Sequence, residues 1–159
     1  MGNVFRAGAD NLYLSNGGTE VFVEVLTLAV AELAAEPWEL RFGALLAAQD
    51  QRVMGRGAVG FDLTELDWGA TAAERAAARG FLLRVIDLAA GRHRWDELGY
   101  DPPYVSDHLL RFRRMVEAFE PPATAPPGEA LPAPAVASCA AHRVLSGLPL
   151  WEGCVFCHR

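Results

Sequence analysis

Residues 71–91 read TAAERAAARGFLLRVIDLAAG, and this stretch carries the clearest structural signal in the chain. Thr71 is followed three residues later by Glu74, the S/T-x-x-E pattern in which both side chains accept hydrogen bonds from free backbone N–H groups at a helix start. The apolar residues that follow recur at the spacing of one helical face. They are Phe81, Leu82, Val85, Ile86 and Ala89. Because Gly91 is a typical helix stop, we expect a helix over about 72–90 that buries this face.

Three further segments show helical periodicity. The first starts from a cap at Thr19 and carries apolar residues as far as Leu33, and the second starts at Pro37, a residue suited to the first turn of a helix. The apolar face of the second extends to Val53. The third opens near Ser106, and its apolar residues step by four, three, four and three. They are Val105, Leu109, Phe112, Val116 and Phe119.

These segments together predict a mainly α-helical fold, a small bundle of about four helices. A chain of 159 residues, 52% of them apolar, has enough apolar material for one domain with its own core. The composition changes between Pro121 and Pro134, where recurring prolines cannot continue a helix. We therefore expect a helical domain over 1–120, a proline-rich linker over 121–135, and a Cys/His segment over 136–159 that packs on the helical domain.

The three cysteines of the chain all lie in the C-terminal segment, together with two of the four histidines. Cys139 and His142 have two residues between them, and Cys154 and Cys157 repeat this spacing. Structural zinc takes four tetrahedral thiolate or imidazole ligands, usually as two closely spaced pairs. The spacing therefore predicts a structural Zn²⁺ knuckle bound by these four residues, with His158 as an alternative fourth ligand.

Other interpretations of this segment stay open. The cysteines also fit small buried apolar side chains, whereas a disulfide is disfavoured because their number is odd and no secretory segment is visible. Residues 154–158 match the C-x-x-C-H haem-attachment pattern, but attachment requires export. A catalytic zinc needs an open coordination position and a nearby general base, and Glu152 is the one acid close in sequence. We therefore favour a non-catalytic zinc, while the enzyme question stays open.

The charge balance bears on the partner. The chain has 14 Lys and Arg against 20 Asp and Glu, a net charge of −6. This disfavours nucleic acid, because proteins that bind the phosphate backbone normally carry a basic face, and it favours a basic protein partner. No signal peptide is visible, and Glu24 and Glu32 interrupt the longest apolar run. We therefore expect a cytoplasmic protein that does not bind a membrane.

Segment 61–68 is one candidate partner-binding surface. Three carboxylates lie close together and precede an aromatic residue. The four residues are Asp62, Glu65, Asp67 and Trp68. An exposed acidic loop of this kind suits a basic partner. The competing interpretation is a solvated loop whose charges keep neighbouring apolar residues soluble, the more common origin of such charges.

Segment 95–104 is the second candidate. It places Trp95, Tyr100 and Tyr104 around a proline turn, and Trp and Tyr are common anchors of protein interfaces. The competing interpretation, which we favour for the loop as a whole, is that it is clamped onto the core.

Four short motifs also suggest a family. In chain order they are Phe61-Asp62-Leu63-Thr64-Glu65-Leu66-Asp67-Trp68, then Phe81-Leu82-Leu83 with Val85-Ile86, then Trp95-Asp96-Glu97-Leu98-Gly99-Tyr100-Asp101-Pro102-Pro103, and Gly153-Cys154-x-x-Cys157. With them the chain resembles some small bacterial proteins found beside polymorphic or contact-dependent toxins. The resemblance implies an immunity protein, which neutralises a toxin domain by binding it. It carries over no defined site residues, and residues 1–60 take no part in it.

We therefore expect a non-catalytic protein-binding protein with a structural zinc site, an immunity protein whose partner is a basic toxin domain. A zinc-dependent hydrolase-like enzyme is one alternative, although the deaminase pattern H-x-E…P-C-x-x-C is absent from the sequence. A zinc-stabilised adaptor in a regulatory or biosynthetic complex is the other alternative.

Overall fold

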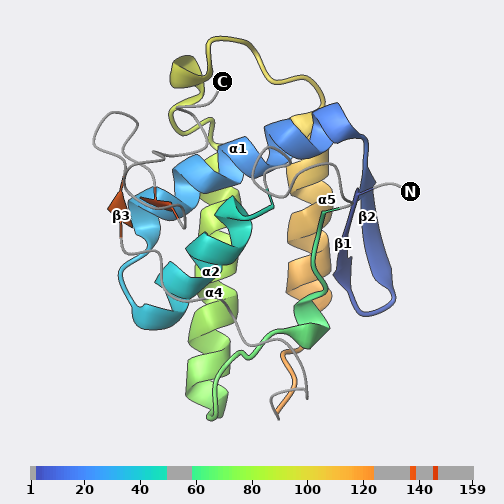
Figure 1. The fold of residues 1–159 in the computed structure, drawn as a ribbon. Helices are drawn as coiled ribbons and strands as arrows, with labels where there is room; N and C mark the ends of the chain where they lie inside the picture. The colour runs from blue at the N-terminus through green and yellow to red at the C-terminus, as the bar shows by residue number, and fades with distance from the viewer. Residues whose placement is uncertain (1–2, 50–58, 124–136, 139–144, 147–159) are drawn as a thin grey trace.

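The computed structural model describes residues 3–49, 59–123, 137–138 and 145–146, and it is mainly helical (Figure 1). Within these residues there are four α-helices, which confirms the predicted mainly helical fold. They are α1 (Asn16–Leu33), α2 (Pro37–Ala47), α4 (Ala72–Ala90) and α5 (Val105–Ala118). A hairpin of β1 (Asn3–Ala7) and β2 (Asp10–Leu14) precedes them.

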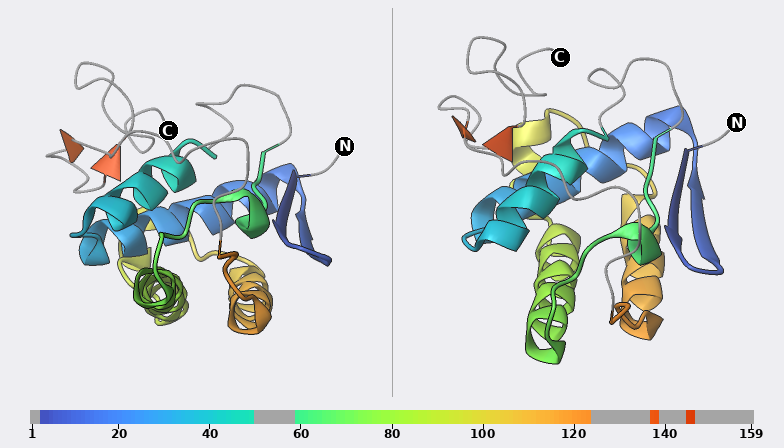
Figure 2. Two further views of the ribbon diagram at one scale, coloured as in Figure 1. Left: turned by 90° about the horizontal axis from the view of Figure 1, so that it is seen from below. Right: turned by 60° about the horizontal axis from the view of Figure 1, so that its bottom comes forward.

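The helices lie in two layers. α4 and α5 lie side by side, seen end on in the left view of Figure 2, and α1 and α2 cross over them. α1 contacts both α4 and α5, and its residues from Phe22 to Val30 are all buried. A helix that is enclosed on every side lies inside a domain, so α1 is the centre of the core.

α4 has the predicted bounds and buries the predicted face. The Thr71 hydroxyl accepts a hydrogen bond from the N–H of Glu74 at 3.1 Å, as the sequence predicts. The other half of the predicted capping box is different, since the Glu74 carboxylate accepts from the N–H of Ala70 at 2.9 Å. The carboxylate thus fixes the residue before the cap, and with it the direction in which the chain enters α4.

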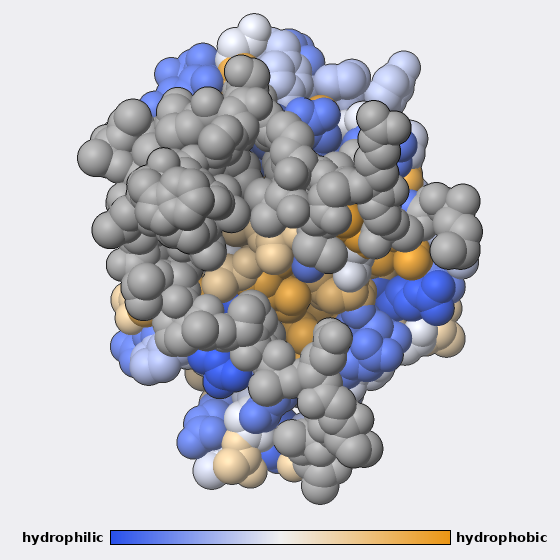
Figure 3. Space-filling view, viewed as in Figure 1, coloured by the Kyte–Doolittle hydropathy of each residue, from blue (hydrophilic) through white to orange (hydrophobic). Residues whose placement is uncertain are grey.

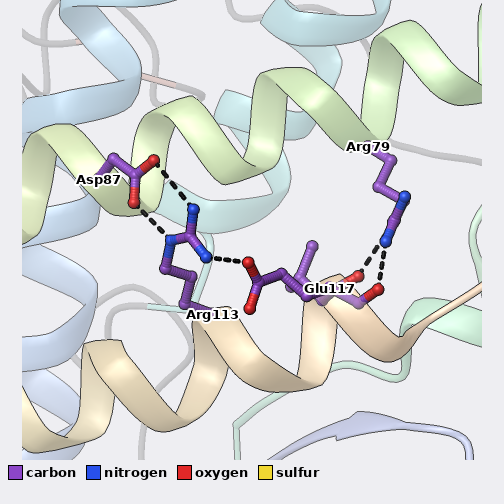
Figure 4. Close-up of polar contacts among 5 residues, drawn as sticks. Arg79, Asp87, Arg113 and Glu117 are labelled. Atoms are coloured by element: carbon purple, nitrogen blue, oxygen red, sulfur yellow. Dashed lines mark hydrogen bonds and ion pairs between the residues drawn. The ribbon is translucent and has the colours of Figure 1, made fainter.

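Charged residues join α4 to α5 (Figure 4). Arg113 on α5 donates to Asp87 on α4, with Nε 2.6 Å from Oδ1, and also pairs with Glu117 on its own helix. Arg79 on α4 donates to the backbone carbonyls of Val116 and Glu117, which lie at the end of α5 where helix carbonyls lack partners within the helix. The hydrogen bonds with Asp87 and Glu117 raise the pKa of Arg113. These contacts hold the two helices together and so constrain the segment that connects them.

α1 begins earlier than predicted. Its cap is Ser15, whose hydroxyl accepts from the N–H of Gly18 at 3.0 Å. Thr19, the predicted cap, is buried, and its hydroxyl accepts from the side-chain amide of Asn3 at 2.8 Å. The side-chain amide oxygen of Asn3 in turn accepts from the N–H of Val59 at 3.0 Å. The Thr19 hydroxyl therefore links β1 to α1 inside the protein instead of capping the helix.

The extended segment that follows residue 58 lies along β1. The carbonyls of Val59 and Phe61 accept from the N–H groups of Val4 and Arg6 at 3.1 and 2.8 Å, so this segment continues the sheet beyond the hairpin. Gly60 lies between them with φ of +132°, and a Cβ there would come within 1.7 Å of the Val4 carbonyl oxygen. Only glycine allows the two backbones to approach this closely.

α2 starts at Pro37 as predicted but ends at Ala47, before the predicted end at Val53. Gln49 follows in a turn, where its side chain donates to the carbonyl of Leu45 at 3.0 Å and accepts from the N–H of Gly60 at 2.9 Å. Gln49 is therefore a link between α2 and the segment beside β1. Residues 50–53 lie outside the described residues.

Aromatic rings from several elements fill the core. Phe5 of β1, Phe22 of α1 and Phe112 of α5 meet with ring centroids 5.1 to 6.3 Å apart. The predicted core face of α5, with the adjoining Phe119, is fully buried. On the side seen in Figure 3, hydrophobic residues reach the surface near the middle of the view, between α2 and α5, with hydrophilic residues below them.

Four short elements lie outside the α-helices and the hairpin in the described part of the chain. Two 3-10 helices, η1 (Leu63–Glu65) and η2 (Trp95–Leu98), lie in the segments before and after α4. β3 (Ala137–Ser138) pairs antiparallel with β4 (Leu145–Ser146), and β4 lies beside α2 and α1. No helix in the described part of the chain is long and apolar enough to span a membrane.

Candidate functional site: the connection between α4 and α5

The predicted zinc ligands lie outside the described residues. This applies to Cys139, His142, Cys154, Cys157 and the alternative ligand His158. In the parts of the chain that the structure does describe, no three His, Cys, Asp or Glu side chains gather in a way that would hold a metal ion. The zinc site therefore stays a prediction, and the described geometry bears on the two candidate contact segments.

In segment 61–68, Asp62 makes hydrogen bonds inside the protein. Its carboxylate accepts from the N–H and hydroxyl of Thr64, at 3.0 and 2.8 Å, and from the N–H of Gly8 at 3.3 Å. Burial raises the pKa of Asp62, but these hydrogen bonds and the charge of Arg6 together outweigh it, so the pKa lies below its usual value. Asp62 thus caps η1 and ties it to the β1–β2 turn.

Asp67 and Trp68 also make hydrogen bonds within the protein. The Asp67 carboxylate accepts from the N–H of Gly69 at 3.0 Å, and its backbone carbonyl accepts from the indole N–H of Trp38 at 2.7 Å. Trp68 is only 2% exposed, and its indole N–H donates to the carbonyl of Leu63 at 2.7 Å. The expectation of Trp68 as a surface contact is therefore wrong, because its ring fills the core beside Trp38. Glu65 is the one carboxylate of this segment that is exposed.

The connection between α4 and α5, residues 91–104, has an unusual backbone. Arg92, Arg94 and Tyr104 have φ of 66°, 58° and 60°, and no other non-glycine residue in the described part of the chain has a positive φ. Each such residue costs about 1–2 kcal/mol relative to an ordinary conformation. Strained backbone of this kind persists where the surrounding structure holds it, and it concentrates at functional sites.

Trp95 anchors this connection to the core. Its side chain is only 5% exposed, so the expectation of Trp95 as a surface contact is wrong, while the interpretation of the loop as clamped onto the core is confirmed. The Arg92 guanidinium lies over the Trp95 ring, 4.7 Å from its centroid, and pairs with Asp101 at 3.0 Å. Arg94 pairs with Glu97 across η2.

Tyr100 reaches from the same connection to a buried acid. Its hydroxyl donates to Oε2 of Glu24 at 2.5 Å. Glu24 lies in α1 and is only 1% exposed. Its neighbours Val23 and Val25 are buried as well, so this carboxyl lies in the most buried part of the helix. Glu24 was not among the candidate site residues predicted from the sequence. Its position inside an apolar helical run was the available signal, because a carboxylate is rarely buried without a partner.

Tyr104 is the most exposed large hydrophobic residue of the described chain, at 78%, and it precedes the first residue of α5. Tyr100 is also exposed, at 39%. Both predicted aromatic contacts from this loop are therefore available to a partner, in contrast to Trp95.

The structure does not bring the two candidate segments together. Segment 61–68 precedes α4 and the connection follows it, and α4 has 19 residues, a length of about 28 Å. Figure 1 shows η1 and the connection at opposite ends of this helix. The described geometry favours the connection as the contact site, because its aromatic side chains are exposed on a backbone under strain.

No known protein family, curated protein or solved structure matches this chain.

Proposed function

We propose that this chain is a non-catalytic protein-binding protein and that the connection between α4 and α5 is its contact surface. The observation that carries the proposal is that Tyr104, a residue 78% exposed, has a left-handed backbone conformation at the start of α5. Burying an exposed tyrosine against a partner removes the apolar surface of its ring from water, which favours binding. Tyrosine is among the residues that contribute most to the binding free energy of interfaces. The ion pair between Asp87 of α4 and Arg113 of α5 supports the proposal, since it helps to hold the surface in one shape before binding.

The partner that we propose is a basic toxin domain, which the chain neutralises as an immunity protein in the cytoplasm. The net charge of −6 supports this choice, since opposite charges speed association and disfavour acidic competitors. The resemblance of the short motifs to immunity proteins points in the same direction.

We further propose that Cys139, His142, Cys154 and Cys157 bind a structural Zn²⁺. Thiolate and imidazole donors in two pairs fit this ion. Four such ligands fill its tetrahedral coordination, so no coordination position is left open for a catalytic water. Support comes from the position of the first pair in the chain, between β3 and β4, which pair with each other beside α2.

The binding proposal is tested by searching the genes beside the one for this chain for a toxin domain, and by measuring the binding of that domain. Purified wild-type protein should bind it, and Tyr104→Ala should weaken the complex by about 2 kcal/mol or more, roughly 30-fold in Kd, measured by isothermal titration calorimetry. Tyr13→Ala is the matched control, because Tyr13 is also exposed but lies on β2. Equal losses in both variants, or no binding by the wild type, would contradict the proposal.

The zinc proposal is tested by metal analysis of protein purified without chelators. We expect about one zinc per chain, and His142→Ala should reduce this ratio while His108→Ala, a substitution on α5, leaves it unchanged. A ratio near zero in the wild type would remove the zinc site from the proposal without affecting the contact surface.

A further inference from the structure

A pocket opens on the connection between α4 and α5. It has a volume of about 510 Å³ and is lined by Arg92, Trp95, Asp96, Gly99, Tyr100 and Asp101. Its walls thus combine an indole, a phenol, two carboxylates and one guanidinium. This combination is chemically typical of a site for an organic cation, which gains from aromatic faces and from carboxylate acceptors together.

Arg92 already makes both of these interactions from within the chain. Its guanidinium lies over the Trp95 ring at 4.7 Å and donates to the Asp101 carboxylate at 3.0 Å. The contacts are on the surface, since the side chains of Arg92 and Asp101 are 63% and 81% exposed. Exposed ion pairs and exposed cation–π contacts are weak, so Arg92 can be displaced at small cost.

The backbone gives a second reason to expect displacement. Arg92 has φ of 66°, so the residue that holds the guanidinium over Trp95 is itself in a strained conformation. Gly91 before it ends α4. Movement of Arg92 out of the pocket therefore does not require any change in the helices or in the buried Trp95.

We propose that this pocket receives an arginine side chain of the protein partner, and that Arg92 is an internal substitute that the incoming guanidinium displaces. The inference rests on the proposed binding function and deepens it, because it names the chemical group that a basic partner inserts. Arginine fits better than lysine, since a planar guanidinium can stack on Trp95 and donate to Asp101 at the same time. The charges agree, because removal of Arg92 from the pocket leaves Asp96 and Asp101 facing the ligand.

Tyr100 forms a wall of the pocket that is in place before a ligand binds. Its hydroxyl is held by the buried carboxylate of Glu24 at 2.5 Å, so the phenol ring that lines the pocket has a fixed position. A ligand therefore meets preformed walls on the side of Trp95 and Tyr100, and only Arg92 has to move.

The test uses a small probe, so that it does not depend on the partner. N-acetyl-L-arginine amide is titrated into ¹⁵N-labelled protein, and the indole N–H signal of Trp95 is followed by NMR. In Arg92→Ala we expect binding about tenfold tighter than in the wild type, because the probe no longer has to displace Arg92. Adding Asp101→Asn to Arg92→Ala should remove this gain.

Two controls exclude simpler explanations. Arg114→Ala removes the same charge from α5, outside the pocket, and should bind the probe as weakly as the wild type. N-acetyl-L-citrulline amide has the same shape without the charge and should not bind. If Arg92→Ala binds no more tightly than Arg114→Ala, or if the citrulline probe binds equally well, the inference is wrong.

The same measurements distinguish a failure of the arginine pocket from misfolding of a variant and from a failure of the proposed function. Dispersed NMR spectra of each variant establish that it is folded, and Arg92→Gln serves as a second variant if Arg92→Ala is not. Loss of toxin binding in Tyr104→Ala together with no probe binding in Arg92→Ala would overturn the arginine pocket and leave the proposed function in place. The opposite result, with probe bound and no toxin partner, would overturn the proposed function alone.

Discussion

The two ends of α4 are connected to the rest of the chain in opposite ways. Before α4, the side chains of Asp62 and Asp67 accept hydrogen bonds from backbone N–H groups, and Trp68 is enclosed in the core. After α4, the backbone is strained at Arg92, Arg94 and Tyr104, and exposed tyrosines face solvent. Both segments are rich in acids and aromatic residues, so their composition does not separate them.

This difference shows how a carboxylate in a loop should be judged. A carboxylate that satisfies backbone donors stabilises the fold and has little left to offer a partner. Left-handed residues and exposed aromatic rings both lower the stability of the segment that contains them. Such a loss is expected where natural selection favours binding over stability. If the segment before α4 is structural and the segment after it is functional, substitutions in the first should lower the free energy of unfolding and substitutions of exposed residues in the second should lower partner affinity.

The largest effect is expected for Trp68. Trp68→Ala removes a buried ring next to Trp38 and Phe119 and should lower the free energy of unfolding by about 3–5 kcal/mol. Tyr104→Ala should change it by no more than about 0.5 kcal/mol, because this ring is exposed. Urea unfolding followed by circular dichroism measures both. A small loss in Trp68→Ala would show that the segment before α4 is not part of the core.

Tyr100 should follow. Tyr100→Phe removes the hydroxyl that donates to the buried Glu24 side chain and should destabilise the protein by about 1.5 kcal/mol, the upper part of the range for a single intramolecular hydrogen bond. Urea unfolding followed by circular dichroism measures the loss, with Tyr13→Phe on β2 as the control that should have almost no effect. Equal free energies of unfolding of the two variants would mean that the contact between the connection and α1 contributes little.

Asp62 should have a moderate effect that depends on pH. Asp62→Ala removes the cap of η1 and should cost about 1 kcal/mol near neutral pH, while Glu65→Ala should cost almost nothing. Because the folded-state pKa of Asp62 lies below 3.8, its stabilisation is present above that pH and is lost as the pH falls through the folded-state value. The difference in urea midpoint between wild type and Asp62→Ala should therefore shrink below about pH 4. A constant difference across this range would exclude a role for the ionised carboxylate.

The smallest effect is expected for the strained backbone itself, and its sign is opposite. Tyr104→Gly relieves a left-handed conformation worth about 1–2 kcal/mol and adds chain entropy to the unfolded state worth about 0.5–1 kcal/mol. The net result should be about 0–1.5 kcal/mol of added stability, together with loss of partner binding. Tyr13→Gly, in the strand β2, should instead destabilise. Destabilisation by Tyr104→Gly would contradict the interpretation of this backbone as strained.

The helices were predictable wherever local sequence controlled them. Periodicity together with the Thr71 cap and Gly91 gave the bounds of α4, and the four-three spacing gave the buried face of α5. The start of α1 was not predictable, since Ser15 and Thr19 are both good caps. Their roles depend on Asn3, which is distant in sequence and contacts Thr19 inside the fold.

The candidate site was predicted only in part. Tyr100 and Tyr104 are exposed as expected, whereas Trp68 and Trp95 are buried, and no local rule distinguishes these aromatic residues from one another. Exposure depends on which surfaces α1, α2 and α5 cover after folding. Glu24 was missed for the same reason, because its partner Tyr100 lies 76 positions further along the chain.

The sequence by itself determined that this protein is mainly helical, where α4 begins and ends, and which residues of α4 and α5 face the core, since these follow from backbone hydrogen bonding and apolar spacing within a few turns. The tertiary structure alone decided which carboxylates are bound to backbone N–H groups, which aromatic rings reach solvent, and that Arg92 lies over Trp95 beside Asp101. These properties arise from contacts between segments that only folding brings together, and side-chain type does not encode them.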